Sequence, residues 1–464
     1  MSVAERLISY ITSVRYEDLP REVVITAKRL VMNTLGATLA GSGAEGVKEV
    51  AELVKEWGGK PKSTVMLYGC KVPAHEAVLV NATMARALDF DEFHLHTGIH
   101  SGATVVPVAL AASELCGGVD GKEFITALVV GAEVMCRMRL VPDSCIGVSG
   151  WTGEVYGAFG AAITAGRTLE ITEKEMRNAL GLALSQSSGT AQTIYDGVLG
   201  TRVQQGFSAR AGLLSTVLAT KGITGAQNFL EGRAGFYPVY YRGMDYDISR
   251  LVDGIGERYE LLNTVTKPYP CCGFLMAPIE NVINIMRHNN LSRHDISKVI
   301  VRVNQRMYNT VYAPSETKYR PQTIADAIFS LPYVLSTALL RGDMSLEDFS
   351  AEAIRDPVRL DVANKVEILV DEGIERESKE LNLSLSLHSV ELQTKDGQCF
   401  SQKMYHAKGF PQRPMTMADL AEKARKCARF AVKPFPEGKV EELKGLVEHL
   451  EEHGNVNLFL EFLS

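Results

Sequence analysis

Apolar residues recur every three or four positions through most of the first half of the chain. In residues 20–41 they form one stripe, made of Val23, Val24, Ala27, Leu30, Val31 and Leu35. Such spacing is typical of an amphipathic helix. Further helices are predicted at residues 46–57, 74–88, 105–116, 124–138, 156–169, 173–187 and 209–221. Small residues on several faces would let these helices approach closely, so this half predicts a helical bundle with a heavily buried interior.

The pattern changes after about residue 265. The stretch KVIVRV at 298–303 alternates polar and β-branched residues, which is typical of a strand, and NKVEILV at 364–370 does so less regularly. Two more strands are predicted at 390–394 and 399–403, around the hairpin turn sequence Lys395-Asp396-Gly397. The remaining predicted helices are residues 276–287, 324–340, 345–353, 417–430 and 440–452.

This order of helices, strands and helices predicts a mainly α protein with a smaller α+β unit. We place a large all-helical domain at residues 1–265 and 411–464, and the α+β domain at 266–410. A length of 464 residues fits two such domains. The larger domain is then discontinuous along the chain, because both chain ends contribute to it.

Composition excludes several classes of protein. With 46% hydrophobic and 22% charged residues, the chain is neither disordered nor dependent on disulfides. The net charge is −6 and no basic stripe is visible, so a nucleic-acid partner is not expected. The eight cysteines match no disulfide framework or zinc spacing. Glu5 and Arg6 interrupt any signal peptide, and no apolar run is long enough for a bilayer, which predicts a cytoplasmic protein without a membrane partner.

The densest polar cluster is DFDEFHLH at residues 89–96, followed by His100. Three of the ten histidines fall within seven residues, beside three carboxylates and between apolar helices. Burying such groups is costly unless they are paired or functional. Three interpretations stay open: a metal site, a proton-transfer site with His100 oriented by an aspartate, or a capped helix start with solvated side chains. His94 and His96 point to opposite sides of an extended segment, which weakens a chelate.

Three other positions could carry chemistry. Lys267 begins KPYPCCGF, where two prolines fix an extended path, so its ammonium could bind a carboxylate or act as a base, or it is a surface lysine on a linker. Tyr333 follows a proline inside a helical pattern, and it is either a cleft-facing phenol or a core aromatic with a hydrogen-bonded hydroxyl. Arg202, between two predicted helices, could contact an anion.

Taken together, these segments resemble the MmgE/PrpD family, which contains 2-methylcitrate dehydratases, cis-aconitate decarboxylases and iminodisuccinate epimerases. The resemblance covers nearly the whole chain. It is carried by LDFDEFHLHTGIHSGATVVPVALAASE at 88–114, YGAFGAAITAGRTLEIT at 156–172, QQGFSARAG at 204–212, GITGAQNFLEGRAGF at 222–236, KPYPCCGF at 267–274 and IFSLPYVLSTALLRG at 328–342.

The resemblance implies a fold, a reaction class and partners. The fold would be an all-helical domain made from both chain ends, with a smaller α+β lid domain inserted between them. The family also implies a homodimer formed through the helical domain, an active site between the two domains, and no metal or organic cofactor. The substrate would be a small carboxylic acid. The chemistry would be proton abstraction next to a carboxylate, followed by elimination, decarboxylation or reprotonation.

Several of the family's functional positions match residues of this sequence. The resemblance implies that His100 and Lys267 form the proton-transfer pair, that Tyr333 is an acid or hydrogen-bond donor, and that Asp89 orients the site. Arg202 is the expected contact for a substrate carboxylate. The other positions expected near the substrate are Asp91, Phe93, His94, Trp151 and Met276.

Departures from the family pattern narrow the reaction. Decarboxylase-type members have a threonine at the position of Phe93, a histidine near the position of Trp151 or Thr152, and another at that of Met276. Their lysine before a later turn is replaced here by Thr201 or Arg202. An aromatic ring cannot transfer the protons that an imidazole transfers. These departures argue against a cis-aconitate decarboxylase, weaken a 2-methylcitrate assignment, and favour a smaller or less charged acid. The leading hypothesis is a cofactor-independent lyase of the 2-methylcitrate dehydratase type, acting on a small hydroxy-acid. The alternatives are an epimerase or isomerase, a decarboxylase of a small di- or tricarboxylate, and a catalytically silent binding protein.

Overall fold

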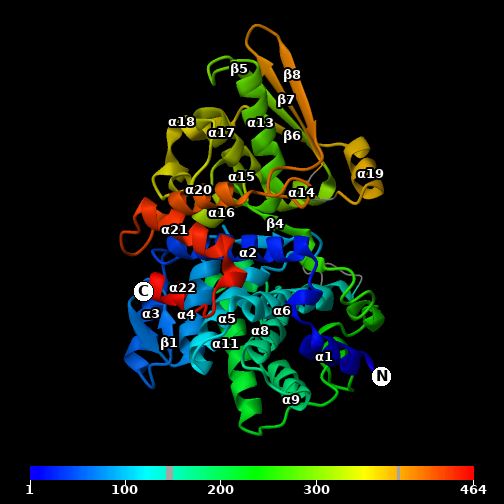
Figure 1. Cartoon of the computed structure of the whole chain (residues 1–464). Helices are drawn as coiled ribbons and strands as arrows, with labels where there is room; N and C mark the ends of the chain where they lie inside the picture. The colour runs from blue at the N-terminus through cyan, green and yellow to red at the C-terminus, as the bar shows by residue number, and fades with distance from the viewer. Residues whose placement is uncertain (143–149, 384–386) are drawn as a thin grey trace. The chain divides into compact units, whose positions relative to one another are not determined.

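The computed structural model describes residues 1–142, 150–383 and 387–464. The chain forms two compact units (Figure 1). Unit 1 comprises Met1–Val265 and Thr416–Ser464, and unit 2 comprises Thr266–Met415. The predicted second boundary, at residues 410 and 411, lies a few residues earlier than the one in the structure. The mainly helical character of the chain is confirmed.

Unit 1 is built from helices contributed by both ends of the chain. From the N-terminal part come α1 (Val3–Ser13), α2 (Arg21–Gly41), α3 (Val47–Trp57), α4 (Ala74–Arg86), α5 (Ser101–Cys116), α6 (Gly121–Leu140), α8 (Glu154–Thr168), α9 (Glu173–Leu184), α10 (Gln192–Tyr195), α11 (Gly200–Thr220) and α12 (Phe236–Tyr240). From the C-terminal part come α20 (Met417–Ala428), α21 (Glu437–Glu448) and α22 (Leu458–Phe462). The short strands β1 (Ser63–Val65) and β2 (Cys70–Val72) pair antiparallel, and β3 covers Glu92–His94.

Glycines set how closely the central helices of unit 1 approach one another. A Cβ built on Gly160 of α8 would lie 2.2 Å from the side chain of Met135 on α6, which is closer than any side chain tolerates. Elsewhere in unit 1, Gly36 of α2 faces Ala424 of α20. A Cβ built on Gly36 would lie 3.2 Å from the Cβ of Ala424. This second contact attaches the C-terminal helices, red in Figure 1, to the N-terminal helix α2.

Unit 2 contains a four-stranded sheet in the order β6-β5-β7-β8. Its strands are β5 (Ile296–Val303), β6 (Val366–Val370), β7 (His388–Thr394) and β8 (Cys399–Met404). Strand β6 runs parallel to β5, whereas β7 and β8 are antiparallel to their neighbours. The turn between β7 and β8 contains Gly397 at a φ of +91°, the left-handed conformation that glycine adopts without strain. All four strands were predicted from the sequence within two residues at each end.

In unit 2, two of the predicted helices are wrong, and four helices, at residues 305–311, 315–319, 357–363 and 372–380, were not predicted. The helices of unit 2 are α13 (Met276–His288), α14 (Gln305–Val311), α15 (Ser315–Tyr319), α16 (Ile324–Ile328), α17 (Leu331–Arg341), α18 (Pro357–Ala363) and α19 (Glu372–Glu380). The single helix predicted at 324–340 is wrong. Ser330 instead caps a new helix, its hydroxyl accepting the Tyr333 amide, and Pro332 suits the first turn of that helix. The helix predicted at 345–353 is replaced by two short 3₁₀ turns, Leu346–Phe349 and Ala353–Arg355.

Among the helices of the described residues, none combines the length and the apolar character needed to cross a lipid bilayer.

His388, the first residue of β7, makes the stability of unit 2 depend on pH. Its ring is fully buried, and this burial lowers the pKa of His388 from 6.5 to about 4. Between these values the unfolded chain binds a proton that the folded protein does not. Stability is therefore fully present above pH 6.5 and is lost as the pH falls toward 4.

We expect His388→Leu to remove this dependence, which amounts to roughly 3 kcal/mol in the free energy of unfolding. Urea unfolding at pH 7 and at pH 4.5 measures it, with His449→Leu as the control because that ring is exposed. An equal loss of stability on acidification in wild type and His388→Leu would contradict the assignment.

Candidate active site

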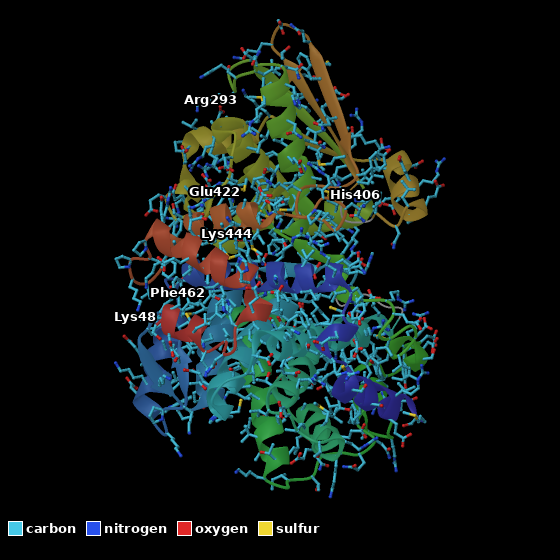
Figure 2. All side chains as sticks on the ribbon, in the orientation of Figure 1. Lys48, Arg293, His406, Glu422, Lys444 and Phe462 are labelled. Carbon is cyan, nitrogen blue, oxygen red and sulfur yellow. The ribbon has the colours of Figure 1, made fainter. Side chains whose placement is uncertain are left out.

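Most charged side chains lie at the surface, as Lys48 does in Figure 2. Charged groups that are buried are therefore informative, because their burial is costly unless they are paired. In unit 1 they include Asp91 and Glu92, and in unit 2 they include Lys267. These three belong to the two segments in which the sequence placed the proton-transfer residues.

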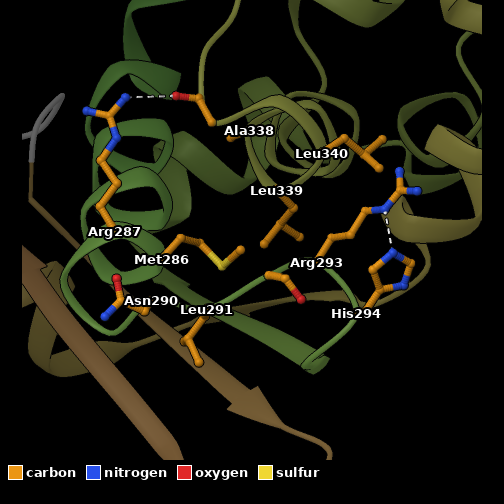
Figure 3. Close-up of a pocket in the computed structure, with 11 residues that line it drawn as sticks. Met286, Arg287, Asn290, Leu291, Arg293, His294, Ala338, Leu339 and Leu340 are labelled. Atoms are coloured by element: carbon orange, nitrogen blue, oxygen red, sulfur yellow. Dashed lines mark hydrogen bonds between the residues drawn. The ribbon is translucent and has the colours of Figure 1, made fainter.

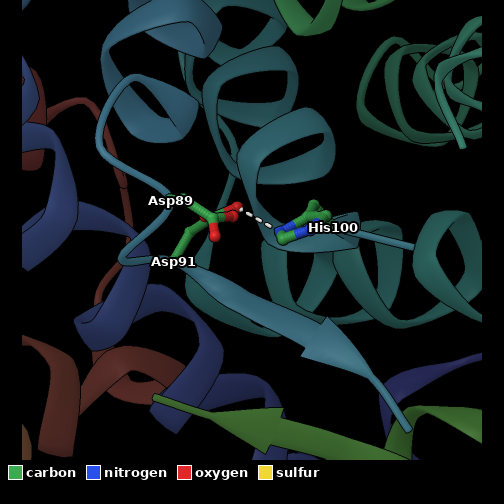
Figure 4. Close-up of side chains that lie close together, drawn as sticks. All are labelled: Asp89, Asp91 and His100. Atoms are coloured by element: carbon green, nitrogen blue, oxygen red, sulfur yellow. Dashed lines mark hydrogen bonds and ion pairs between the residues drawn. The ribbon is translucent and has the colours of Figure 1, made fainter. Parts of the chain in front are cut away.

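The loop between α4 and α5 brings Asp91 and His100 together. Asp89 turns the chain with a φ of +52°, β3 follows, and the loop closes through a 2.8 Å hydrogen bond from the His94 amide to the Ile99 carbonyl. His100 then stands as the residue that precedes the first turn of α5. As a result, Nδ1 of His100 lies 2.9 Å from Oδ2 of Asp91 (Figure 4). Asp91 is fully buried, whereas the His100 side chain is 14% exposed.

Arg86 balances the two aspartates of this loop. Its Nη1 lies 2.7 Å from Oδ1 of Asp89 and 3.6 Å from Oδ1 of Asp91. Burial alone would lower the pKa of Arg86, but the carboxylates of Asp89, Asp91 and Glu154 outweigh it and raise that pKa. The carboxylate that contacts His100 directly is that of Asp91. The predicted role of Asp89 in orienting the site stays a prediction.

A carboxylate also holds the start of α5. Glu92 accepts a 2.6 Å hydrogen bond from the Gly102 amide and a 3.0 Å bond from the Asn33 side chain. Lys423 of α20 donates to the Asn33 side chain at 2.7 Å and to the Phe90 carbonyl at 2.6 Å. Burial raises the pKa of Glu92 above its usual value. A carboxylate at a helix N-terminus is favourable because it meets free amides and the positive end of the helix dipole.

Sequence reasoning missed the partners of this network. Arg86 had a local signal, because it lies three residues before Asp89 at the end of a predicted helix. Asn33 and Lys423 had none, since they reach the loop from chain segments far away in the sequence.

His94 does not join the His100 group. Its Nδ1 accepts from the Thr97 amide at 3.2 Å, and its Nε2 lies 3.5 Å from Oε2 of Glu260. Burial alone would raise the pKa of Glu260, but its contacts with His94, Asn263 and Arg137 lower the pKa to about 2. The histidine cluster is thus divided, and the predicted role of His94 in substrate binding stays a prediction.

The aromatic ring of Phe93 lies near His100, whereas that of Trp151 packs against Tyr240. The ring centroid of Phe93 lies 6.5 Å from that of His100. Trp151 packs edge-on against Tyr240 at 4.9 Å, and the segment that follows it reaches Ile99 at Gly153. The side chains near His100 therefore include an apolar ring at the position where decarboxylase-type members have a threonine.

The structure does not place Arg202 with the His100 group. Its Nη1 donates to the Glu45 carbonyl at 2.6 Å, and burial lowers the pKa of Arg202. It lines a cavity of about 380 Å³ together with Glu45, Glu49 and Thr83, and none of Asp89, Asp91 and His100 lines that cavity. A role in binding substrate carboxylate stays a prediction.

In unit 2, Lys267 follows β4 (Thr264–Thr266) and precedes the first proline of its segment. The amide of Thr266 bonds to the Gly409 carbonyl at 2.9 Å, which anchors this strand next to Lys267. Lys267 is only 2% exposed, so it is not the surface lysine of a linker. Met276 is fully buried at the start of α13.

Tyr333 has the surroundings of a core aromatic. It is fully buried, its hydroxyl donates to the Asp348 carbonyl, and Nη1 of Arg359 donates to that hydroxyl at 2.8 Å. Burial raises the pKa of Tyr333 to about 12, against the opposing charge of Arg359. A role as acid would require these bonds to rearrange, and it stays a prediction.

Two other features of the described residues resemble binding sites. Asp89, Asp91 and His100 each contribute one oxygen or nitrogen atom to a group in which all atoms lie within 4.8 Å of one another, as metal ligands do. The Arg86 guanidinium already places a positive charge beside these aspartates, which disfavours a bound cation.

In unit 2, a cavity of about 660 Å³ is lined by residues that include Met286, Arg293 and Leu339 (Figure 3). None of the ten predicted site residues lines it.

Comparison with known proteins identifies the family. The MmgE/PrpD N-terminal domain matches residues 5–249, and the MmgE/PrpD C-terminal domain matches residues 269–451. The chain belongs to the MmgE/PrpD family. It is therefore an enzyme, and the predicted family membership is confirmed.

Similar proteins share nearly the whole length of this MmgE/PrpD chain. A cis-aconitate decarboxylase of Aspergillus terreus is 26% identical over 478 residues, which cover 100% of this chain and 96% of the relative. Cis-aconitate decarboxylases of Mus musculus and Homo sapiens are each 24% identical, covering 97% of this chain and 91% and 92% of the relatives.

The close approach at Gly102 generates a stability prediction. A Cβ at this position would lie 2.5 Å from Oγ1 of Thr34 and 2.6 Å from Oε1 of Glu92. We expect Gly102→Ala to lower the free energy of unfolding by about 1–3 kcal/mol, because Glu92 must leave the helix start or the helix must shift. Thermal and urea unfolding measure the change.

Gly438→Ala is the matched control, since a Cβ there meets nothing within 4 Å. It should be neutral or stabilising by up to about 1 kcal/mol. Equal stabilities of the two variants would show that Glu92 does not constrain the start of α5.

Proposed function

We propose that this protein is a lyase that removes carbon dioxide from a small unsaturated di- or tricarboxylate, with His100 as the proton-transfer residue. The observation that carries the proposal is the 2.9 Å contact between Nδ1 of His100 and the fully buried carboxylate of Asp91. The relatives support decarboxylation over the dehydration predicted from the sequence, because those that match over nearly the whole chain are named cis-aconitate decarboxylases.

The reaction needs a proton at one defined place. When carbon dioxide leaves, the electron pair of the broken carbon–carbon bond stays on the substrate. In an unsaturated acid this pair can move through the double bond to a carbon beside a remaining carboxylate, and that carbon then takes a proton. Because Asp91 occupies Nδ1, the Nε2 atom of His100 is the ring atom available to deliver it. Asp91 would fix the orientation of the ring.

The carboxylates of the substrate need cations. Lys267 is buried on a segment that two prolines stiffen, so its ammonium would lose little freedom on binding. We assign it to a substrate carboxylate or to the second proton transfer. Asp89 would act indirectly, by holding Arg86 beside Asp91.

A dehydratase of the 2-methylcitrate type is the second candidate. The observation that favours it is the ring of Phe93 beside His100, together with buried Met276 at a position where decarboxylase-type members have a histidine. Elimination of water needs one base and one acid, and His100 and Lys267 could supply both. An epimerase would use the same pair to remove and return one proton. The homodimer implied by the resemblance and the cytoplasmic location predicted from the sequence stay predictions.

We expect wild-type enzyme incubated with cis-aconitate to release carbon dioxide in step with loss of the acid. His100→Ala should lower this rate by about 10²–10⁴-fold, the usual contribution of a general acid or base. His449→Ala is the control, because the His449 side chain is 64% exposed. Carbon dioxide release and proton NMR of the remaining acid provide the readouts.

Other results would redirect the assignment. An alkene formed from 2-methylcitrate without carbon dioxide would favour the dehydratase. Deuterium uptake from D₂O with neither product would favour the epimerase. Full activity of His100→Ala would show that His100 is not the proton-transfer residue.

A further inference from the structure

Lys318 is a buried lysine that neither the sequence prediction nor the proposed function uses. It lies on the short helix α15 in unit 2 and is only 8% exposed. Within residues 1–142, 150–383 and 387–464, its ammonium makes no hydrogen bond and no ion pair. The Lys318 side chain is thus largely removed from water and its ammonium has no protein acceptor among these residues, which is unfavourable unless something else supplies negative charge.

The acid that acts electrostatically on Lys318 has another task. Burial lowers the pKa of Lys318, and the charge of Asp326 offsets only part of this lowering. The carboxylate of Asp326 accepts from the amide and the hydroxyl of Thr323, at 3.0 and 2.9 Å, and from the Gln322 amide at 3.2 Å. It therefore caps the start of α16 and does not pair with Lys318.

Hydrogen bonds connect Lys318 to the segment that carries Lys267. The amide of Cys272 donates to the Ile328 carbonyl at 3.1 Å. Two residues further on, the hydroxyl of Ser330 donates to the carbonyl of Lys318. Cys272 is also close enough to act electrostatically on the Lys318 ammonium. The α15 turn and the proline-stiffened segment thus pack together in one part of unit 2.

We propose that Lys318 binds a carboxylate of the acid substrate, as a second lysine of unit 2 in addition to Lys267. This inference rests on the proposed function. A di- or tricarboxylate brings two or three negative charges out of water, and one ammonium balances only one of them. A second ammonium with no protein partner fits this need, and it selects for acids with more than one carboxylate.

Binding of tricarballylate tests the proposal without requiring turnover. This saturated tricarboxylate has no hydroxyl to eliminate and no double bond to assist decarboxylation. We expect Lys318→Met to raise its Kd by at least about tenfold, and Lys318→Arg to restore most of the affinity because the charge returns. Lys379→Met is the control, because that side chain is 76% exposed and pairs with Glu375 at the surface. Isothermal titration calorimetry provides the Kd values.

Wild-type affinity in Lys318→Met, or no binding of tricarballylate to the wild type, would overturn the proposal. If Lys318→Met does not fold, acetylation of wild-type lysines by acetic anhydride replaces it. Tricarballylate should then slow acetylation of Lys318 but not of Lys379, and equal rates would overturn the proposal. Binding that depends on Lys318 without release of carbon dioxide from cis-aconitate would leave the anion site standing and reject the proposed reaction.

Discussion

The Asp91 carboxylate is held out of water between the guanidinium of Arg86 and the imidazole of His100, and this constraint shapes the rest of the unit 1 site. A buried carboxylate needs positive charge and hydrogen bonds close by. The end of α4 supplies Arg86, and the start of α5 supplies His100. Glu92 in turn fixes the start of α5 through the Gly102 amide. The contacts that stabilise this helix junction therefore also orient the imidazole.

The sequence predicted the location of this junction better than its internal connections. Three histidines and three carboxylates between apolar helices marked residues 89–100 as a site, because local composition carries that signal. Which aspartate contacts His100 depends on the turn at Asp89. The positive φ of Asp89 could not be predicted from the sequence pattern. Likewise, the break between α16 and α17 depends on the Ser330 cap, which competes locally with a helical hydrophobic pattern.

The remaining parts of the site could not be predicted from one sequence, because they join distant segments of the chain. Lys423 reaches Asn33 and the Phe90 carbonyl from the C-terminal helices, and only the fold brings them together. Lys318 belongs to no sequence motif. Only the structure shows that its side chain is buried and that its ammonium has no partner among the described residues. Local sequence pointed to Lys267 and Tyr333, and the family resemblance supplied the catalytic roles predicted for them. The structure assigns Tyr333 the surroundings of a core residue, because its hydroxyl is hydrogen-bonded to Arg359.

The most direct test of the coupled Asp91–His100 pair is a double-mutant cycle on kcat/KM for carbon dioxide release. If Asp91 acts only by orienting the imidazole, Asp91→Asn and His100→Ala each slow the reaction, and the double variant is no slower than His100→Ala alone. Losses that multiply in the double variant would contradict this coupling and show that the two side chains act independently.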